Sequence, residues 1–121
     1  MSEMQGSKVW LDGHVVDGAE ARISVFDHGL LYGDGLFEGI RIYRGGVFRL
    51  QDHLRRFEAG AKALGIELPG GPQAVEAVVL ETARAYGKQE GYIRLLLTRG
   101  QGALGVDPST CEKPQLICIV K

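Results

Sequence analysis

The spacing of apolar residues changes along this chain of 121 residues, and that change limits the possible folds most strongly. Apolar side chains recur at helical spacing over residues 50–64 and over residues 75–86, and a glycine follows each segment as a stop signal. Segments with the pattern of strands come before and after these helices. Hairpins first, with helices between later strands, are typical of an α+β fold. The sequence therefore predicts a mostly antiparallel sheet with two amphipathic helices.

The predicted strands are short and end at turn residues. Asp12-Gly13 and Arg44-Gly45-Gly46 are each placed to turn a hairpin. Residues 100–113 are rich in Gly, Pro and Asp and are predicted to form a loop. We expect strands over residues 8–11, 14–16, 22–25, 37–43, 47–49, 91–99 and 114–121.

Glycine makes up 18 of the 121 residues, which is well above the usual ~7%. Residues 26–43 hold several of them among Leu, Phe, Ile and Tyr, although glycine weakens the interiors of strands and helices. We interpret Gly29, Gly33 and Gly35 as positions where a loop turns sharply. Gly39 is interpreted as clearing space on a strand face for a planar ligand.

Charge and motif content argue against several classes of function. The formal net charge is −1, so nothing favours nucleic acid or an anionic membrane surface as a partner. No apolar run approaches the roughly 20 residues of a membrane span, and the first ten residues lack the features of a signal peptide. Cys111 and Cys118 are not at metal-ligand spacing, and P-loop, GxSxG and HExxH motifs are absent. We therefore predict a cytoplasmic protein without a metal site.

Strand alternation gathers candidate binding residues on common faces. Phe37, Gly39 and Arg41 share one face, where the missing side chain of Gly39 would leave room for a planar ligand. The alternative is a strand with a glycine bulge and an arginine at the solvent edge. Tyr92 and Arg94 share a face of a later strand, and a guanidinium fork beside a phenol suits a carboxylate. The alternative there is an arginine paired with a local glutamate.

One arginine of the first predicted helix is a candidate for binding an anion. At 100° per residue, Arg55 falls on the flank that carries Glu58 and Lys62, which is typical of a solvated surface. Arg56 falls on the other flank, beside His53. A planar, bidentate donor suits phosphate, so Arg56 is the better candidate of the two.

Five segments follow one another from Val9 to about Lys121: VWLDG, ISVFDHGLLYGDGLFEGIRIY, VFRLQDHLRRFEAGAKAL, GYIRLLLTRG and GALGVDP. In this order and spacing they resemble the N-terminal small domain of the fold-type IV pyridoxal-phosphate aminotransferases, most of all the branched-chain amino acid aminotransferases. The resemblance implies the α+β fold of that domain and a homodimer. It also implies amino transfer between leucine, isoleucine or valine and 2-oxoglutarate.

The resemblance also implies roles for individual residues. Arg56 in HLRR matches the arginine that binds the phosphate of pyridoxal 5'-phosphate. The residues that match the family's substrate pocket are Phe37, Gly39, Arg41, Tyr92 and Arg94. The residues that match those lent to the pocket of the neighbouring subunit are Tyr32, Leu104 and Val106.

The chain departs from the family in one respect, which is the lysine that forms a Schiff base with the cofactor. None of its lysines stands at the family's catalytic position, and they are Lys8, Lys62, Lys88, Lys113 and Lys121. We therefore expect residues 1–121 to be the small N-terminal domain, with the catalytic-lysine domain outside this chain. Such a domain would not transaminate alone and would not bind the cofactor tightly.

Three alternatives stay open at this point. D-amino-acid aminotransferases and aminodeoxychorismate lyases share the YGDG region. The former use an Arg-x-His carboxylate trap, but here Leu96 stands two positions beyond Arg94. The third alternative, suggested by the missing lysine, is a non-catalytic dimerisation or binding module.

Overall fold

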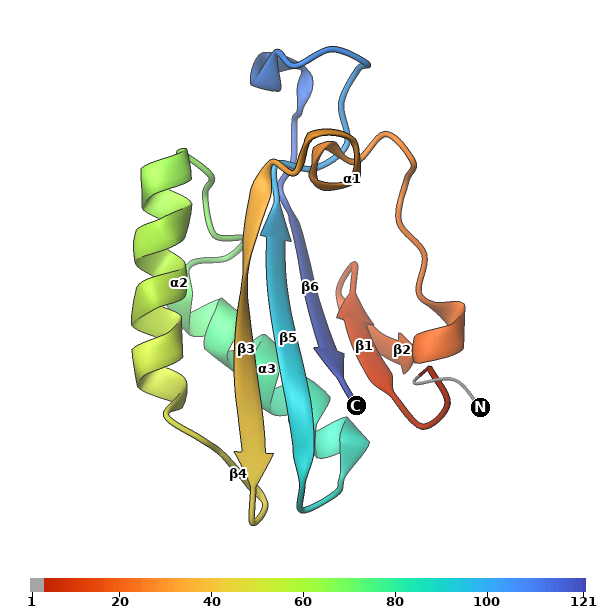
Figure 1. Ribbon diagram of the computed structural model, residues 1–121, viewed down its shortest axis with the longest axis vertical. Helices are drawn as coiled ribbons and strands as arrows, with labels where there is room; N and C mark the ends of the chain where they lie inside the picture. The colour runs from red at the N-terminus through yellow and green to blue at the C-terminus, as the bar shows by residue number, and fades with distance from the viewer. Residues whose placement is uncertain (1–3) are drawn as a thin grey trace.

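The computed structural model describes residues 4–121, which form a six-stranded sheet with two long helices on one face (Figure 1). The strands are β1 (Lys8–Leu11), β2 (His14–Asp17), β3 (Gly35–Tyr43), β4 (Gly46–Val47), β5 (Gly91–Thr98) and β6 (Gln115–Val120). The helices are α1 (His28–Tyr32), α2 (Leu50–Leu64) and α3 (Pro72–Tyr86), with 3-10 turns at Gly18–Glu20 and Pro108–Thr110. The sheet order is β2-β1-β6-β5-β3-β4 and all neighbours are antiparallel, so the predicted α+β class is confirmed. Among the described residues, no helix has both the length and the apolar character that crossing a membrane requires.

The hydrophobic core lies between the sheet and the two long helices. Ile40 of β3, with Ile93 and Leu95 of β5, points toward the helices at alternate positions. Phe57 of α2 and Val79 of α3 are fully buried in the same cluster. Each such side chain stabilises the fold by roughly 1.5–3 kcal/mol when it leaves water. In Figure 1, α2 runs beside β3 and α3 crosses behind the strands, so both helices cover the same face.

The opposite face of the sheet carries no long helix within residues 4–121 (Figure 1). Residues 18–23 cover its β1 end, where Val9 and Leu11 are buried. We call the remaining surface of β3, β5 and β6 the open face. Its outward side chains, and one glycine, are Phe37, Gly39, Arg41, Tyr43, Tyr92, Arg94, Leu96, Ile117 and Ile119.

Two predicted strands differ from the structure. Residues 22–25 form no strand, because turns satisfy the backbone around them: Ala21 N donates to Gly18 O (3.3 Å) and Phe26 N donates to Ser24 Oγ (3.0 Å). The predicted strand over residues 47–49 ends at Val47. Arg49 has a φ of 53°, which breaks the extended backbone and leads into α2.

The short helix α1 replaces what the sequence predicted to be a loop. Asp27 caps it, since Asp27 Oδ1 accepts from Gly29 N (2.7 Å) while Oδ2 accepts from Thr98 Oγ1 (2.9 Å). A Cβ at position 29 would overlap Thr98 Cγ2, so Gly29 allows the helix to pack against the end of β5. Gly33, with a φ of 66°, ends the helix in the left-handed conformation.

The segment before β3 is joined to the end of α2 by an arginine that the sequence reasoning did not single out. Arg99 Nε and Nη2 donate to the Asp34 carboxylate at 2.8 and 3.1 Å. The same guanidinium donates to Leu64 O (2.9 Å) and Gly65 O (3.2 Å) at the C-terminus of α2. The hydrogen bond to Asp34 raises the pKa of Arg99, and a cation at this helix end is favourable.

We expect Asp27→Ala to lower the free energy of unfolding by roughly 2–3 kcal/mol, because it removes a helix cap and leaves the buried Thr98 hydroxyl without its acceptor. Asp107→Ala is the matched control, since Asp107 caps an exposed turn through Ser109 N (2.9 Å) and its loss should matter much less. Denaturant titration, monitored by circular dichroism, measures the free energy of unfolding of both variants. Equal losses in the two variants would contradict this account of Asp27.

Candidate functional site

The pairing of β3 with β5 brings the predicted substrate residues into neighbouring positions on the open face. Gly39 lies opposite Arg94, and Arg41 lies opposite Tyr92. Phe37 lies opposite Leu96, on the same face. The predicted alternation is confirmed, because the side chains between Phe37 and Arg41 on the other face are buried.

Arg94 is held on the open face by aromatic residues. Its Nε and Nη2 donate to Tyr92 Oη at 3.1 and 2.9 Å, and its guanidinium carbon lies 4.5 Å from the centre of the Phe37 ring. Within residues 4–121, no carboxylate pairs with Arg94, so the alternative of a local glutamate partner is not observed. The positive charge is therefore oriented by a phenol and a ring and is available to an incoming carboxylate.

Gly39 acts on this cluster through Tyr92. A Cβ at position 39 would lie 2.6 Å from Tyr92 Oη, so a larger residue would displace the phenol that holds Arg94. The sequence predicted that the space above Gly39 would hold a ligand, but the Tyr92 phenol occupies it in this structure. Direct contact between Gly39 and a ligand stays a prediction.

Arg41 shares the open face but directs its guanidinium elsewhere. Its Nη2 lies 3.6 Å from Glu90 Oε1, and its guanidinium carbon lies 5.5 Å from the centre of the Tyr43 ring. Both partners of the ion pair are more than half exposed, so it contributes little to stability. The structure therefore brings Arg41 to the same face as Arg94 without joining the two in one cluster.

Arg56 lies on α2, at the edge of β3, and binds a side chain from the other face of that strand. Its Nε and Nη2 donate to Glu38 Oε2 and Oε1, each at 2.8 Å, while His53 Nδ1 lies 2.7 Å from Oε1. Glu38 is 6% exposed, whereas the side chain of Arg56 is 74% exposed. The hydrogen bond from Arg56, opposed by burial, lowers the pKa of Glu38, so the carboxylate is ionised at neutral pH.

The residues predicted to serve a neighbouring subunit meet at one end of the sheet. Tyr32 Oη of α1 accepts a hydrogen bond from Gly105 N, in the loop that also carries Leu104 and Val106. The His28 ring is 4.9 Å from the Tyr32 ring, and His28 Nε2 lies 2.8 Å from a carbonyl of the same loop. Leu104 and Val106 are 72% and 78% exposed, so they are accessible to another molecule.

The predicted site residues thus fall into three groups: the open face, the edge held by Arg56, and the loop beside α1. Sequence reasoning assigned no role to Glu38, which holds Arg56. Two signals could have found it: a carboxylate on the inward face of a strand, and a His53–Arg56 pair one turn apart on the facing helix flank.

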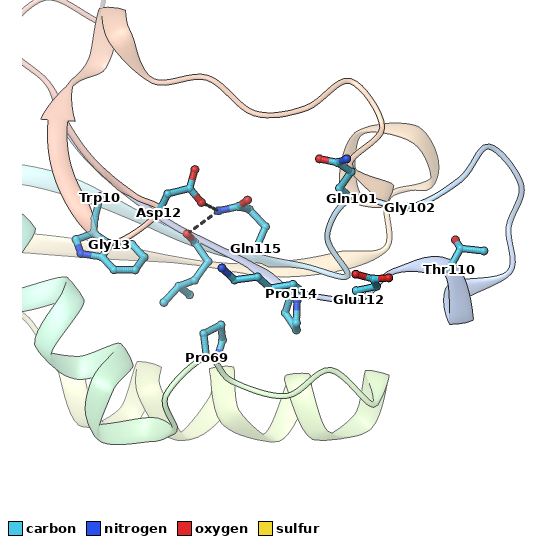
Figure 2. Close-up of a pocket in the computed structure, with 12 residues that line it drawn as sticks. Trp10, Asp12, Gly13, Pro69, Gln101, Gly102, Thr110, Glu112, Pro114 and Gln115 are labelled. Carbon is cyan, nitrogen blue, oxygen red and sulfur yellow. Dashed lines mark hydrogen bonds between the residues drawn. The ribbon is translucent and has the colours of Figure 1, made fainter.

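A cleft of about 850 Å³ lies elsewhere, between the β1–β2 turn and the segment that leads into β6 (Figure 2). Trp10, Pro69 and Pro114 line it, and Gln115 Nε2 donates to Asp12 Oδ1 at 3.2 Å across one side. None of the predicted site residues lines this cleft. The charged and aromatic side chains of the open face, rather than this cleft, define the candidate site.

Residues 35–121 match the family described as amino-transferase class IV. A Methanocaldococcus jannaschii protein assigned as a branched-chain-amino-acid aminotransferase is 52% identical over 112 residues, which cover 93% of this chain and 39% of that protein. D-alanine aminotransferase of Staphylococcus haemolyticus is 34% identical over 116 residues, which cover 95% of this chain and 41% of that enzyme. The chain therefore spans about two fifths of the length of these curated relatives.

A solved structure of the branched-chain aminotransferase from the thermophilic archaeon Thermoproteus uzoniensis, with norvaline, has the same fold. It superposes with a TM-score of 0.83 at 36% sequence identity, over 94% of this chain and 40% of that chain. The family match spans most of the sequence and includes β3, β5, β6 and both long helices. The chain therefore belongs to the class IV aminotransferase family.

Proposed function

We propose that this chain is the N-terminal small domain of a pyridoxal-phosphate-dependent branched-chain amino acid aminotransferase. The complete enzyme exchanges amino groups between leucine, isoleucine or valine and 2-oxoglutarate. The observation that carries the proposal is Arg94, a guanidinium oriented on the open face without a carboxylate partner among residues 4–121. The 52% identity to the Methanocaldococcus jannaschii relative supports branched-chain substrates.

In this proposal Arg94 binds a substrate carboxylate through the N–H groups that Tyr92 leaves free. A charge-assisted, planar contact fixes the orientation of the substrate as well as its position. Phe37 holds the guanidinium from one side, and Gly39 leaves room for the Tyr92 phenol. Arg41 lines the same face closer to the β3–β4 hairpin and offers a second cation there.

Arg56 is suited to hold the phosphate group of pyridoxal 5'-phosphate. Glu38 engages the edge of the guanidinium formed by Nε and Nη2, while Nη1 has no partner among residues 4–121. The open edge of an exposed guanidinium can bind a phosphate monoester with two parallel hydrogen bonds. Bound pyridoxal phosphate would supply the electron sink that stabilises negative charge at the substrate Cα. The lysine of the Schiff base belongs, in this proposal, to a C-terminal domain, so residues 1–121 are inactive alone.

Two surfaces are proposed to meet other parts of the enzyme. Leu96, Ile117 and Ile119 are only partly buried on the open face, which suits coverage by the C-terminal domain. Leu104 and Val106 project from the loop that Tyr32 anchors, and in a homodimer they would form an apolar wall of the neighbour's substrate pocket. We place the complete enzyme in the cytoplasm.

The activity itself can be tested with the protein encoded by the full reading frame around this sequence. We expect it to bind pyridoxal phosphate, which would show as the absorbance band of the protein-bound cofactor. We also expect it to exchange amino groups between L-valine and 2-oxoglutarate. Exchange with D-alanine but not L-valine would indicate a D-amino-acid aminotransferase. Release of pyruvate from aminodeoxychorismate would indicate a lyase, and bound cofactor without turnover would contradict the enzymatic proposal.

Arg94→Gln in that enzyme should reduce kcat/KM for 2-oxoglutarate about 10- to 100-fold, because one charged hydrogen-bonding group contributes roughly 1.5–3 kcal/mol. The loss should appear mainly in KM, since the contact is already made in the ground state. Arg84→Gln on α3 is the matched control, because Arg84 is exposed near the end of that helix. Steady-state kinetics of both variants measure the KM for 2-oxoglutarate. An unchanged KM for Arg94→Gln would contradict the proposal that Arg94 binds the substrate.

A further inference from the structure

We infer that Glu38 is a positioning residue: by binding one edge of the Arg56 guanidinium, it aims the other edge at a phosphate-bearing ligand. This inference rests on the proposed function, in which Arg56 holds the cofactor phosphate. It goes further because it assigns a role to a buried carboxylate that does not itself touch the ligand.

The geometry of the pair fixes the plane of the guanidinium. Both Glu38 oxygens are engaged, Oε2 with Arg56 Nε and Oε1 with Arg56 Nη2, each at 2.8 Å. Two parallel hydrogen bonds restrict rotation about the terminal bonds of Arg56, whereas one bond would not. Without them, an arginine that is 74% exposed would sample many rotamers and would lose that freedom on binding.

Glu38 is itself held in place from two sides. It lies on β3 and is 6% exposed, with the buried Ile40 next to it on the same inward face. His53 Nδ1, one turn before Arg56 on α2, lies 2.7 Å from Glu38 Oε1. A carboxylate buried on an apolar face is unfavourable unless it is paired. Here α2 supplies both partners, so strand and helix together form a rigid mount for the guanidinium.

Two other arginines, Arg49 at the N-cap of α2 and Arg55 within the helix, pair with an exposed carboxylate instead. Arg49 and Arg55 both pair with Asp52 at the exposed surface of the helix, and Arg49 Nε lies 2.9 Å from Asp52 Oδ2. Asp52 is about half exposed, so it can follow the arginines and fixes neither of them. Among these three arginines, only Arg56 is bound to a buried carboxylate.

The test compares two ligands that differ only in the phosphate. Pyridoxal 5'-phosphate and pyridoxal are titrated into the apo form of the full-length enzyme, and the dissociation constants are measured by absorbance. For Glu38→Gln we expect the dissociation constant of pyridoxal 5'-phosphate to rise about three- to tenfold, as when one side chain must be immobilised on binding. The dissociation constant of pyridoxal should not change.

Two further variants separate positioning from support of the fold. In an Arg56→Gln background, Glu38→Gln should cause no additional loss that depends on the phosphate. Asp52→Asn, which disturbs the exposed ion pairs of the same helix, should leave the ratio of the two dissociation constants unchanged. If Glu38→Gln does not fold, Glu38→Asp carries the same test, since it keeps the charge but withdraws it from Arg56.

If Glu38→Gln weakens the binding of pyridoxal 5'-phosphate and of pyridoxal equally, Glu38 has only a structural role and the inference is overturned. Tighter binding of pyridoxal 5'-phosphate to Glu38→Gln would also overturn it, because Glu38 would then compete with the phosphate. Failure of the unmodified enzyme to bind either ligand would instead contradict the proposed function, and the inference with it.

Discussion

The register between β3 and β5 decides which side chains of the two strands face the helices and which face away from them. Gly39 opposite Arg94 sets which side chains reach the open face and which reach α2. A slip of one residue would turn Phe37 into the core and Glu38 outward. The adjacent residues Phe37 and Glu38 therefore serve different partners, Arg94 on one side of the strand and Arg56 on the other. One strand thus supports both the surface that we propose binds a carboxylate and the arginine that we propose binds a phosphate.

The glycines around β3 serve this register by allowing close approaches. A Cβ on Gly35 would overlap Leu97 O of β5, and one on Gly39 would press on the Tyr92 phenol. Gly29 lets α1 pack against the end of β5, which places Tyr32 beside the loop of Leu104. The conformational freedom that glycine loses on folding is therefore offset by contacts that no larger residue could make.

Features set by local patterns could be predicted from the sequence, and features set by distant contacts could not. The α2 and α3 helices, the five strands other than the short β4, and the faces of β3 and β5 follow from apolar periodicity and turn residues and were predicted. The strand predicted over residues 22–25 was wrong, because turns satisfy the backbone there. The α1 helix was missed because five residues are too few to show helical periodicity, and its anchor on β5 is Thr98, a residue 71 positions away from Asp27. Arg56 was predicted to lie beside His53, and both side chains do contact Glu38, but this shared partner is fixed only when α2 packs on β3. The roles of these residues in binding stay predictions.

We propose that the open face, through Arg94, binds a substrate carboxylate in a complete aminotransferase. A crystal structure of the full-length protein with pyridoxal phosphate and 2-oxoglutarate tests it most directly. We expect a carboxylate of 2-oxoglutarate within hydrogen-bonding distance of Arg94, with Tyr92 and Phe37 still holding the guanidinium. A 2-oxoglutarate molecule bound away from the open face, with Arg94 paired to a protein carboxylate, would contradict it.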